Sequence, residues 1–301
     1  MNPVIKSFLH APSSTWTHLV IDPATQAAAL IDPVLDFDYP SGATATDSAA
    51  GIIAGMRALD VKLEWILETH AHADHLSAAP QIRDSLGGRI AIGEGIRQVQ
   101  AHFSAELNFE AGFRSDGSQF DHLFKDGECF HLGQLDARVI ATPGHTRDSV
   151  SYLIGDALFV GDTLFMPDGG TARCDFPGGD AGLLYDSIHK LYELPEDTRL
   201  FVCHDYAPGG RAHRCLSSIG EQRRGNIHIH EGISRSQFIS MRGARDRSLG
   251  MPALLYPSVQ VNVRGGEFPP AESNGQVYLK VPLQAQLYLK VPLQAQPRQS
   301  A

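Results

Sequence analysis

Short apolar runs alternate with polar, glycine-rich and proline-rich breaks along the early part of the chain. The runs at 17–22 and 27–32 are separated by a proline-containing turn, and this pattern predicts a β-hairpin. In residues 44–59 the apolar positions recur at helical spacing, which predicts a helix. Residues 63–68 then predict a strand, and residues 78–86 predict a helix that ends at a pair of glycines.

The same alternation continues through the rest of the chain. Further strands are predicted at 89–92, 137–141, 149–154, 157–160 and 200–203. Further helices are predicted at 96–103, 183–194, 212–224 and 234–247. Strands that occur both early and late, with helices between them, predict an α/β protein: an αββα sandwich of two mixed sheets with helices outside.

Four of the predicted strands end in a loop that carries histidine or aspartate. These residues are His70, His72, Asp74 and His75 after the strand at 63–68, then His145, Asp162 and His204 after three later strands. Imidazoles with carboxylates suit a first-row transition metal better than calcium or magnesium, which prefer shells of oxygen. Because functional residues commonly lie on loops held by a rigid scaffold, the pattern predicts a metal site built from these strand ends.

Composition limits the partners and the compartment. A formal net charge of −9 argues against a nucleic-acid surface, and no apolar run approaches the roughly 20 residues that span a bilayer. The first 16 residues lack the features of a secretory signal, and the four cysteines form no Cys-x-x-Cys pair. We therefore expect a cytoplasmic protein with reduced thiols that binds neither nucleic acid nor membrane. A homodimer is the default expectation for its assembly.

Four stretches resemble the metallo-β-lactamase superfamily in content and in order. They are residues 69–75, with the pattern Thr-His-Ala-His-Ala-Asp-His, and residues 143–146, 161–164 and 203–206. Within that superfamily, residues 161–179, 226–228 and 251–265 resemble the persulfide dioxygenases, specifically the bacterial group called β-lactamase hydrolase-like, which is similar to the ETHE-type sulfur dioxygenases.

The resemblance implies an iron site and an organisation of the chain. One Fe²⁺ would be held by His70, His145 and Asp162, with positions left open for O₂ and a persulfide sulfur. The other loop residues would orient these ligands and tune the iron; they are His72, Asp74, His75 and His204. Residues 1–250 would form the catalytic domain and 251–286 an extension packed on it. Residues 287–296 nearly repeat 277–286, so 287–301 are expected to be a poorly ordered, duplicated tail.

The resemblance also implies a substrate and the residues that contact it. The reaction would oxidise glutathione persulfide, or a related persulfide, with O₂ to sulfite. Arg173, Tyr206 and His228 would contact the substrate. His228 stands where the animal-type enzymes carry an arginine that helps to hold glutathione, and an imidazole holds a carboxylate less firmly than a guanidinium does.

Two other hypotheses remain open at the level of sequence. A glyoxalase II-like hydrolase of glutathione thioesters would use the same loops with two metals and a bridging hydroxide, and every residue of a second metal site is present. The segment after Asp162 and the C-terminal segment favour the dioxygenase. A non-catalytic sulfur-binding or metal-sensing protein would need only part of the triad, which here is complete.

Overall fold

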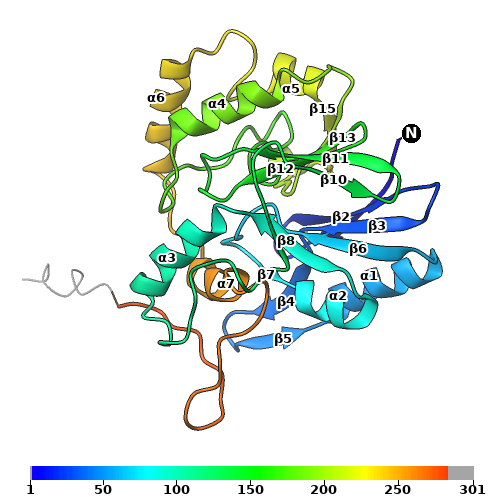
Figure 1. Cartoon of the computed structure of the whole chain (residues 1–301). Coiled ribbons are helices and arrows are strands. Elements are labelled where there is room, and N and C mark those ends of the chain that lie inside the picture. Colours follow the sequence, from blue (N-terminus) through cyan, green and yellow to red (C-terminus); the bar gives the residue numbers. More distant parts are fainter. Residues whose placement is uncertain (1, 284–301) are drawn as a thin grey trace, which may run out of the picture.

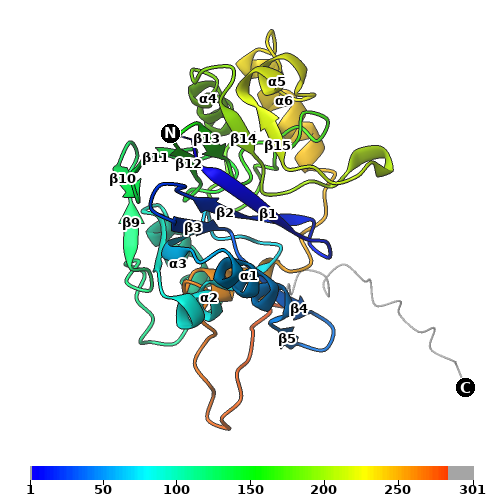
Figure 2. The same cartoon turned by 90° about the vertical axis from the view of Figure 1, so that its right-hand side faces the viewer.

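Two sheets face each other, and helices cover the outer face of each (Figure 1). The computed structural model describes residues 2–283. Figure 2, turned by 90°, shows the same layers, with α4, α5 and α6 on one side of the paired sheets and α1 and α2 on the other. This arrangement confirms the αββα sandwich predicted from the order of strands and helices.

The first sheet contains the early strands, in the order β1-β2-β3-β6-β8-β9. Their bounds are Val4–His10 for β1, Thr15–Ile21 for β2, Ala27–Ile31 for β3, Lys62–Leu67 for β6, Arg89–Gly93 for β8 and His122–Phe124 for β9. From β3 to β9 the neighbours pair in parallel, and β1 and β2 complete the sheet antiparallel. Every residue of β3 is buried, because this central strand is covered on both faces.

The second sheet contains the later strands, in the order β10-β11-β12-β13-β14-β15. Their bounds are Cys129–Leu132, Leu135–Ala141, Val150–Ile154, Ala157–Phe159, Arg199–Phe201 and Leu216–Ser218. Only β13 and β14 pair in parallel within this sheet. A small third sheet joins β5 (Ala43–Ala45), β4 (Val34–Asp38) and β7 (Leu76–Ser77).

Helices close the two outer faces. Beside the first sheet lie α1 (Asp47–Ala58), α2 (Ala79–Leu86), α3 (Ile96–Glu106) and α7 (Leu255–Asn262). Beside the second sheet lie α4 (Ala181–Leu191), α5 (Ile219–Gly225) and α6 (Arg235–Asp246), and a short 3₁₀ helix spans Pro208–Gly210. No helix among residues 2–283 is long and apolar enough to cross a membrane.

Three apolar clusters hold the layers together. Between the sheets, aromatic side chains pack on one another, among them Trp65, Phe124, Phe130 and Tyr152. Of the two further clusters, one lies between the first sheet and its helices and the other between the second sheet and its helices. Since both faces of each sheet are buried, the strands cannot shift against one another without exposing apolar surface. The loops at the strand ends therefore start from fixed points.

The structure corrects several element predictions. Residues 212–224 were predicted as one helix, but they form an irregular segment, the edge strand β15 and the first turns of α5. The edge strand β1 and the small third sheet were not predicted, and neither was α7. Edge strands and two- or three-residue strands carry little periodic signal, because few of their side chains must be buried. The predicted duplicated tail at 287–301 lies outside the described residues.

Candidate metal site

The loop that follows β6 is held in place by two buried carboxylates. The Thr69 N–H and hydroxyl donate to the two carboxylate oxygens of Asp32, over 2.8 and 3.0 Å. The Ala71 N–H donates to the Asp148 carboxylate over 2.7 Å. Residues 68–75 lack regular secondary structure, so these side chains supply partners that a strand or helix would otherwise give. We refer to residues 69–75 as the metal loop.

Glycines bring two other loops close to this one. Gly144 and Gly161 precede His145 and Asp162, and both have positive φ, at 144° and 52°. A Cβ on Gly161 would lie 2.6 Å from the hydroxyl oxygen of Thr69, and one on Gly144 would lie 2.3 Å from the backbone nitrogen of Leu184. Glycine is therefore required at both positions for the backbone conformation and for the close approach of the chain.

The side chains of His70, His145 and Asp162, which the family resemblance grouped together, lie close to one another. Their ligand atoms lie within 4.8 Å of one another, and all three side chains are buried. The Asp162 Oδ2 lies 3.9 Å from the His70 Nε2 and 3.6 Å from the His145 Nε2. The His145 Nδ1 donates to the Arg173 carbonyl over 2.8 Å, so its Nε2 carries the lone pair that a metal would bind.

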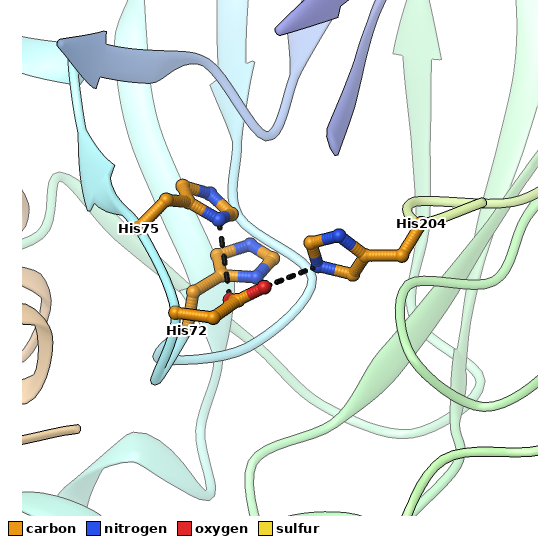
Figure 3. Close-up of side chains that lie close together, drawn as sticks. His72, His75 and His204 are labelled. Atoms are coloured by element: carbon orange, nitrogen blue, oxygen red, sulfur yellow. Dashed lines mark ion pairs between the residues drawn. The ribbon is translucent and has the colours of Figure 1, made fainter. Parts of the chain in front are cut away.

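A second group forms beside the first from His72, Asp74, His75 and His204. Figure 3 shows His72 and His75 on one side and His204 opposite them. The Asp74 carboxylate joins the two sides, with one oxygen 3.3 Å from the His75 Nδ1 and the other 3.2 Å from the His204 Nε2. The Asp162 Oδ1 lies 3.4 Å from the His204 Nε2, so the two oxygens of Asp162 face the two groups.

His72 differs from His70 in how its ring is held. Its Nε2 lies 3.0 Å from the Asp32 Oδ1 and 3.7 Å from the Glu68 Oε2. Because a carboxylate can only accept, the hydrogen bond places a proton on Nε2 and leaves Nδ1 to face the rest of the site. His72 is thus fixed by two acidic neighbours, whereas no hydrogen-bond partner among the described residues meets the His70 Nε2.

The chemistry of these atoms fits a bound cation. Several buried side-chain atoms without a hydrogen-bond partner among residues 2–283 gather here: His70 Nε2, His72 Nδ1, both ring nitrogens of His75, Asp162 Oδ1 and His204 Nε2. Buried polar atoms without partners are costly, and a group of nitrogen and carboxylate ligands facing one another is what a transition metal satisfies. The residues therefore fit a metal ion.

The protonation states of the histidines follow from burial and charge. Burial lowers the pKa of His70 and of His72 well below the usual value, so both are neutral at pH 7, the form that binds a metal. Burial would also lower the pKa of His204, but the carboxylates of Asp162 and Asp74 outweigh it and raise that pKa.

A cavity of about 330 Å³ opens directly onto the first group. His145, Asp162 and Asp74 are among the residues that line it. Its walls combine apolar rings with guanidinium groups; they include Phe165, Phe176, Tyr206, Arg173, Arg242 and Arg245. The volume falls in the range of about 300 to 1,000 Å³ that is usual for small-molecule sites.

Two of the three predicted substrate contacts line this cavity. The Tyr206 ring stacks on His204, with centroids 5.8 Å apart, and more than half of the side chain is exposed. Arg173 lines the cavity as well, but its guanidinium already donates to Asp175 over 2.6 and 2.7 Å and to the Gly250 carbonyl over 2.7 Å.

The structure does not bring the third residue, His228, into the cavity wall. The His228 Nδ1 accepts from the Thr171 N–H over 3.0 Å, and the ring packs against Gly170. Burial, and then the nearby positive charges of Arg242 and Arg245, lower the pKa of His228 to about 4. The ring is therefore neutral at pH 7 and supports the loop that leads to Arg173.

Cys174 is a structural residue of the same loop. Its side chain is buried, and its backbone N–H donates to the Asp246 carboxylate over 3.0 Å. Burial raises the pKa of the Cys174 thiol to about 12, so the reactive thiolate is scarcely populated at pH 7.

The fold and the two groups of candidate ligands together define an αββα protein with the residues of a metal site. The model of the metallo-β-lactamase superfamily matches residues 12–204, and the chain belongs to that superfamily. The likeness inferred from the sequence motifs is thereby confirmed at the level of the superfamily.

Within the superfamily, this chain is similar to several individual proteins. The beta-lactamase hydrolase-like protein of Agrobacterium fabrum is 49% identical over 93% of this chain, and the chain spans 65% of that relative. Glyoxylase B2 of Dictyostelium discoideum is 48% identical over 93% of this chain and 96% of the relative. The human mitochondrial persulfide dioxygenase ETHE1 is 29% identical over 87% of this chain and 89% of the relative.

Among solved structures, ETHE1 from Myxococcus xanthus superposes with a TM-score of 0.70 at 31% identity, and the match covers 88% of this chain and 100% of that one. The predicted likeness to β-lactamase hydrolase-like and ETHE1 proteins is thus confirmed. The names of the relatives, however, divide between a glyoxylase and a dioxygenase.

Several residues that build the site were not predicted. Asp32 follows β3 in the same way that the predicted residues follow their strands, so the pattern of strand exits contained a signal for it. Asp148, Asn262 and Arg245 had no such signal. Asn262 lies far along the chain from the metal loop, and its contact depends on how α7 packs.

We expect the two histidines of the metal loop to differ in their effect on metal content. His70→Ala, His145→Ala and Asp162→Ala should each remove most of the bound metal and the activity, because each deletes an atom of the first group. His72→Ala is the matched control, from the same loop and with the same side chain removed, and it should leave the metal largely bound. Metal per chain after anaerobic purification measures both effects. Equal loss from His72→Ala and His70→Ala would make His72 a ligand and contradict the assignment.

Proposed function

We propose that this protein is a persulfide dioxygenase that uses one non-haem iron held by His70, His145 and Asp162. The observation that carries the proposal is the geometry of the first group. Two imidazoles and one carboxylate converge from three separate loops, and two of these residues, His145 and Asp162, line the cavity. Such a set on one side of a metal leaves the other side open for two reactants, the arrangement typical of non-haem iron oxygenases.

The proposed reaction balances without another oxidant. A persulfide anion, O₂ and water give a thiol, sulfite and one proton; the S–S bond breaks and the outer sulfur is oxidised by O₂. A bound Fe²⁺ would supply adjacent positions for the persulfide sulfur and O₂ and would mediate the transfer of electrons between them. The likeness to ETHE1 proteins supports this reaction over others of the superfamily.

The residues of this chain have distinct parts in that scheme. The Arg173 carbonyl keeps the His145 proton on Nδ1, which leaves Nε2 available at the iron. Phe165 and Phe176 provide apolar walls that limit the access of water to the reacting sulfur. Tyr206 adds an amphipathic ring at the exposed end of the cavity, where the rest of the substrate would lie.

A second candidate function is favoured by one specific observation. The group of His72, Asp74, His75 and His204 has unpartnered buried ligand atoms of its own, and Asp162 points one oxygen toward it. Two metals bridged by a carboxylate would suit a glyoxalase II-like hydrolysis of glutathione thioesters. The relative named Glyoxylase B2 is consistent with this candidate.

Oxygen uptake separates the two candidates. We expect anaerobically purified, iron-loaded protein to consume O₂ when glutathione persulfide is added and to form about one sulfite per O₂, as the balanced reaction requires. The thioester S-lactoylglutathione is the matched control and should be turned over at background rate. Thioester cleavage without persulfide-dependent O₂ uptake would reject the dioxygenase in favour of the hydrolase.

The charge on the cavity wall supports an anionic substrate. Arg173 pairs with Asp175, and the buried Arg242 pairs with Asp246. Arg245 lines the same cavity, is exposed, and forms no ion pair with the described residues. One guanidinium thus faces the cavity without a carboxylate beside it, and guanidinium is well suited to bind a carboxylate of the substrate. A glutathione persulfide carries such carboxylates.

We expect Arg245→Ala to lower kcat/KM for glutathione persulfide about tenfold, the scale of one exposed charge-assisted hydrogen bond. It should leave kcat/KM for the uncharged 2-hydroxyethyl persulfide unchanged. Arg247→Ala is the control, because Arg247 is exposed one residue beyond α6 but does not line the cavity. Equal loss with both persulfides, or equal effects of the two substitutions, would count against recognition of an anion by Arg245.

A further inference from the structure

The side chain of Asn262 joins the C-terminal helix α7 directly to the metal loop. Its Nδ2 donates to the His72 carbonyl and to the His75 carbonyl, each over 2.8 Å. Its Oδ1 accepts from the Ser77 N–H over 2.9 Å. Both amide protons and one acceptor position of Asn262 are therefore used on residues 72–77. This segment carries three members of the second group, His72, Asp74 and His75.

These hydrogen bonds give partners to two backbone carbonyls of the metal loop. Residues 71 and 72 are irregular and residues 73–75 form a bend, and no other hydrogen bond to the His72 or His75 carbonyl is found among the described residues. The side chain of Asn262 is itself buried, so water does not replace it freely. The orientation of the peptide groups that carry His72 and His75 thus depends on one amide.

The same contact extends to the acidic residues behind the loop. Ser77, whose N–H is bound by Asn262, donates its hydroxyl to the Glu68 Oε1 over 2.5 Å. The other oxygen of Glu68 lies 3.7 Å from the His72 Nε2. Asn262 therefore fixes both the backbone of His72 and, through Ser77, an acidic group beside its ring.

The helix that carries Asn262 is a rigid support. Leu255, Val259 and Val261 of α7 are buried in the cluster between the first sheet and its helices. Just after the helix, the Val263 carbonyl accepts from the Gln100 side chain over 2.8 Å. This helix lies beyond residue 204, where the match to the superfamily model ends.

We propose that Asn262 is a positioning residue for the metal site, and that α7 is required for tight metal binding although it supplies no ligand. By holding the His72 and His75 carbonyls, Asn262 fixes the backbone of the metal loop, from which His70 and members of the second group project. Residues behind the ligands of a metal commonly change its affinity in this way. The proposal requires only that the loop binds a metal, and it does not depend on persulfide oxidation.

The chain offers a closely matched control in Gln260, two residues earlier in α7. Its amide is also buried and also donates to two carbonyls, those of Tyr256 and Lys280, over 2.7 and 2.9 Å. It likewise accepts one N–H, from Lys280, over 2.8 Å. The changes Asn262→Asp and Gln260→Glu therefore replace the same donor with an acceptor facing two carbonyls, and only the first touches the metal loop.

The test measures Co²⁺ binding by the full chain, through the affinity and the visible absorption bands of the bound ion. We expect Asn262→Asp to weaken Co²⁺ binding at least about tenfold and to change the bands, since second-layer substitutions typically cost 10- to 100-fold. Gln260→Glu should leave the Co²⁺ affinity and the absorption bands unchanged, even if it lowers Tm as much as Asn262→Asp does. Asn262→Ala is the second variant and should also weaken binding, without adding a charge.

Two outcomes would overturn the proposal. One is wild-type Co²⁺ affinity and bands in Asn262→Asp or Asn262→Ala. The other is an equal loss of affinity in Gln260→Glu, which would make the effect one of general stability. If an Asn262 variant is unfolded at 25 °C without metal, its affinity for Co²⁺ cannot be measured directly. The rise in Tm on adding Co²⁺ is then measured instead. A gain equal to that of Gln260→Glu then rejects positioning. Absence of O₂ uptake, with Co²⁺ affinity still dependent on Asn262, would reject only the dioxygenase.

Discussion

The site depends on one electrostatic constraint, which is that Asp162 and its neighbouring carboxylates are buried together with histidine nitrogens that have no other partner. Burial raises the pKa of Asp162, and the nearby imidazoles of His204 and His145 only partly offset this rise. A cation among these atoms removes the cost of keeping the carboxylate charged. Four loops from the two sheets bring these buried carboxylates and histidines together, so the free-energy cost of burying the charges is concentrated at one site.

The scaffold explains how such an arrangement is kept. Each ligand loop begins at the end of a strand whose faces are covered, so its starting point is fixed by packing. Beyond that point, hydrogen bonds from Asp32, Asp148 and Asn262 take over from regular secondary structure. The metal loop is thus held from three distant parts of the chain, which restricts the directions in which its histidines can point.

Much of the fold and the candidate residues at the strand exits could be predicted from the sequence, for a physical reason. Buried strands must be apolar and must end where the chain reaches solvent, so both their positions and the His70, His145 and Asp162 exits were visible in the pattern. The edge strand β15 was predicted as helix because its short run lacks the alternation of a half-buried strand. Likewise, His228 was predicted to contact substrate, but its ring packs behind the loop instead.

The remaining features arise from contacts across long stretches of chain. No local pattern brings Asn262 to His72, or brings Arg245 into the lining of the cavity that Asp162 also lines, since both depend on the packing of α6 and α7. The sequence contains the residues of both groups, and only the family resemblance assigned the iron to His70, His145 and Asp162. That choice is where dioxygenase and hydrolase differ, because both would use the same loops.

Anomalous diffraction at the iron absorption edge, from crystals grown and frozen without oxygen, tests this choice most directly. The account predicts a single iron among His70, His145 and Asp162, with no metal peak among Asp74, His75 and His204. Two peaks about 3.5 to 4 Å apart, bridged by Asp162, would mark a dinuclear hydrolase site and contradict it.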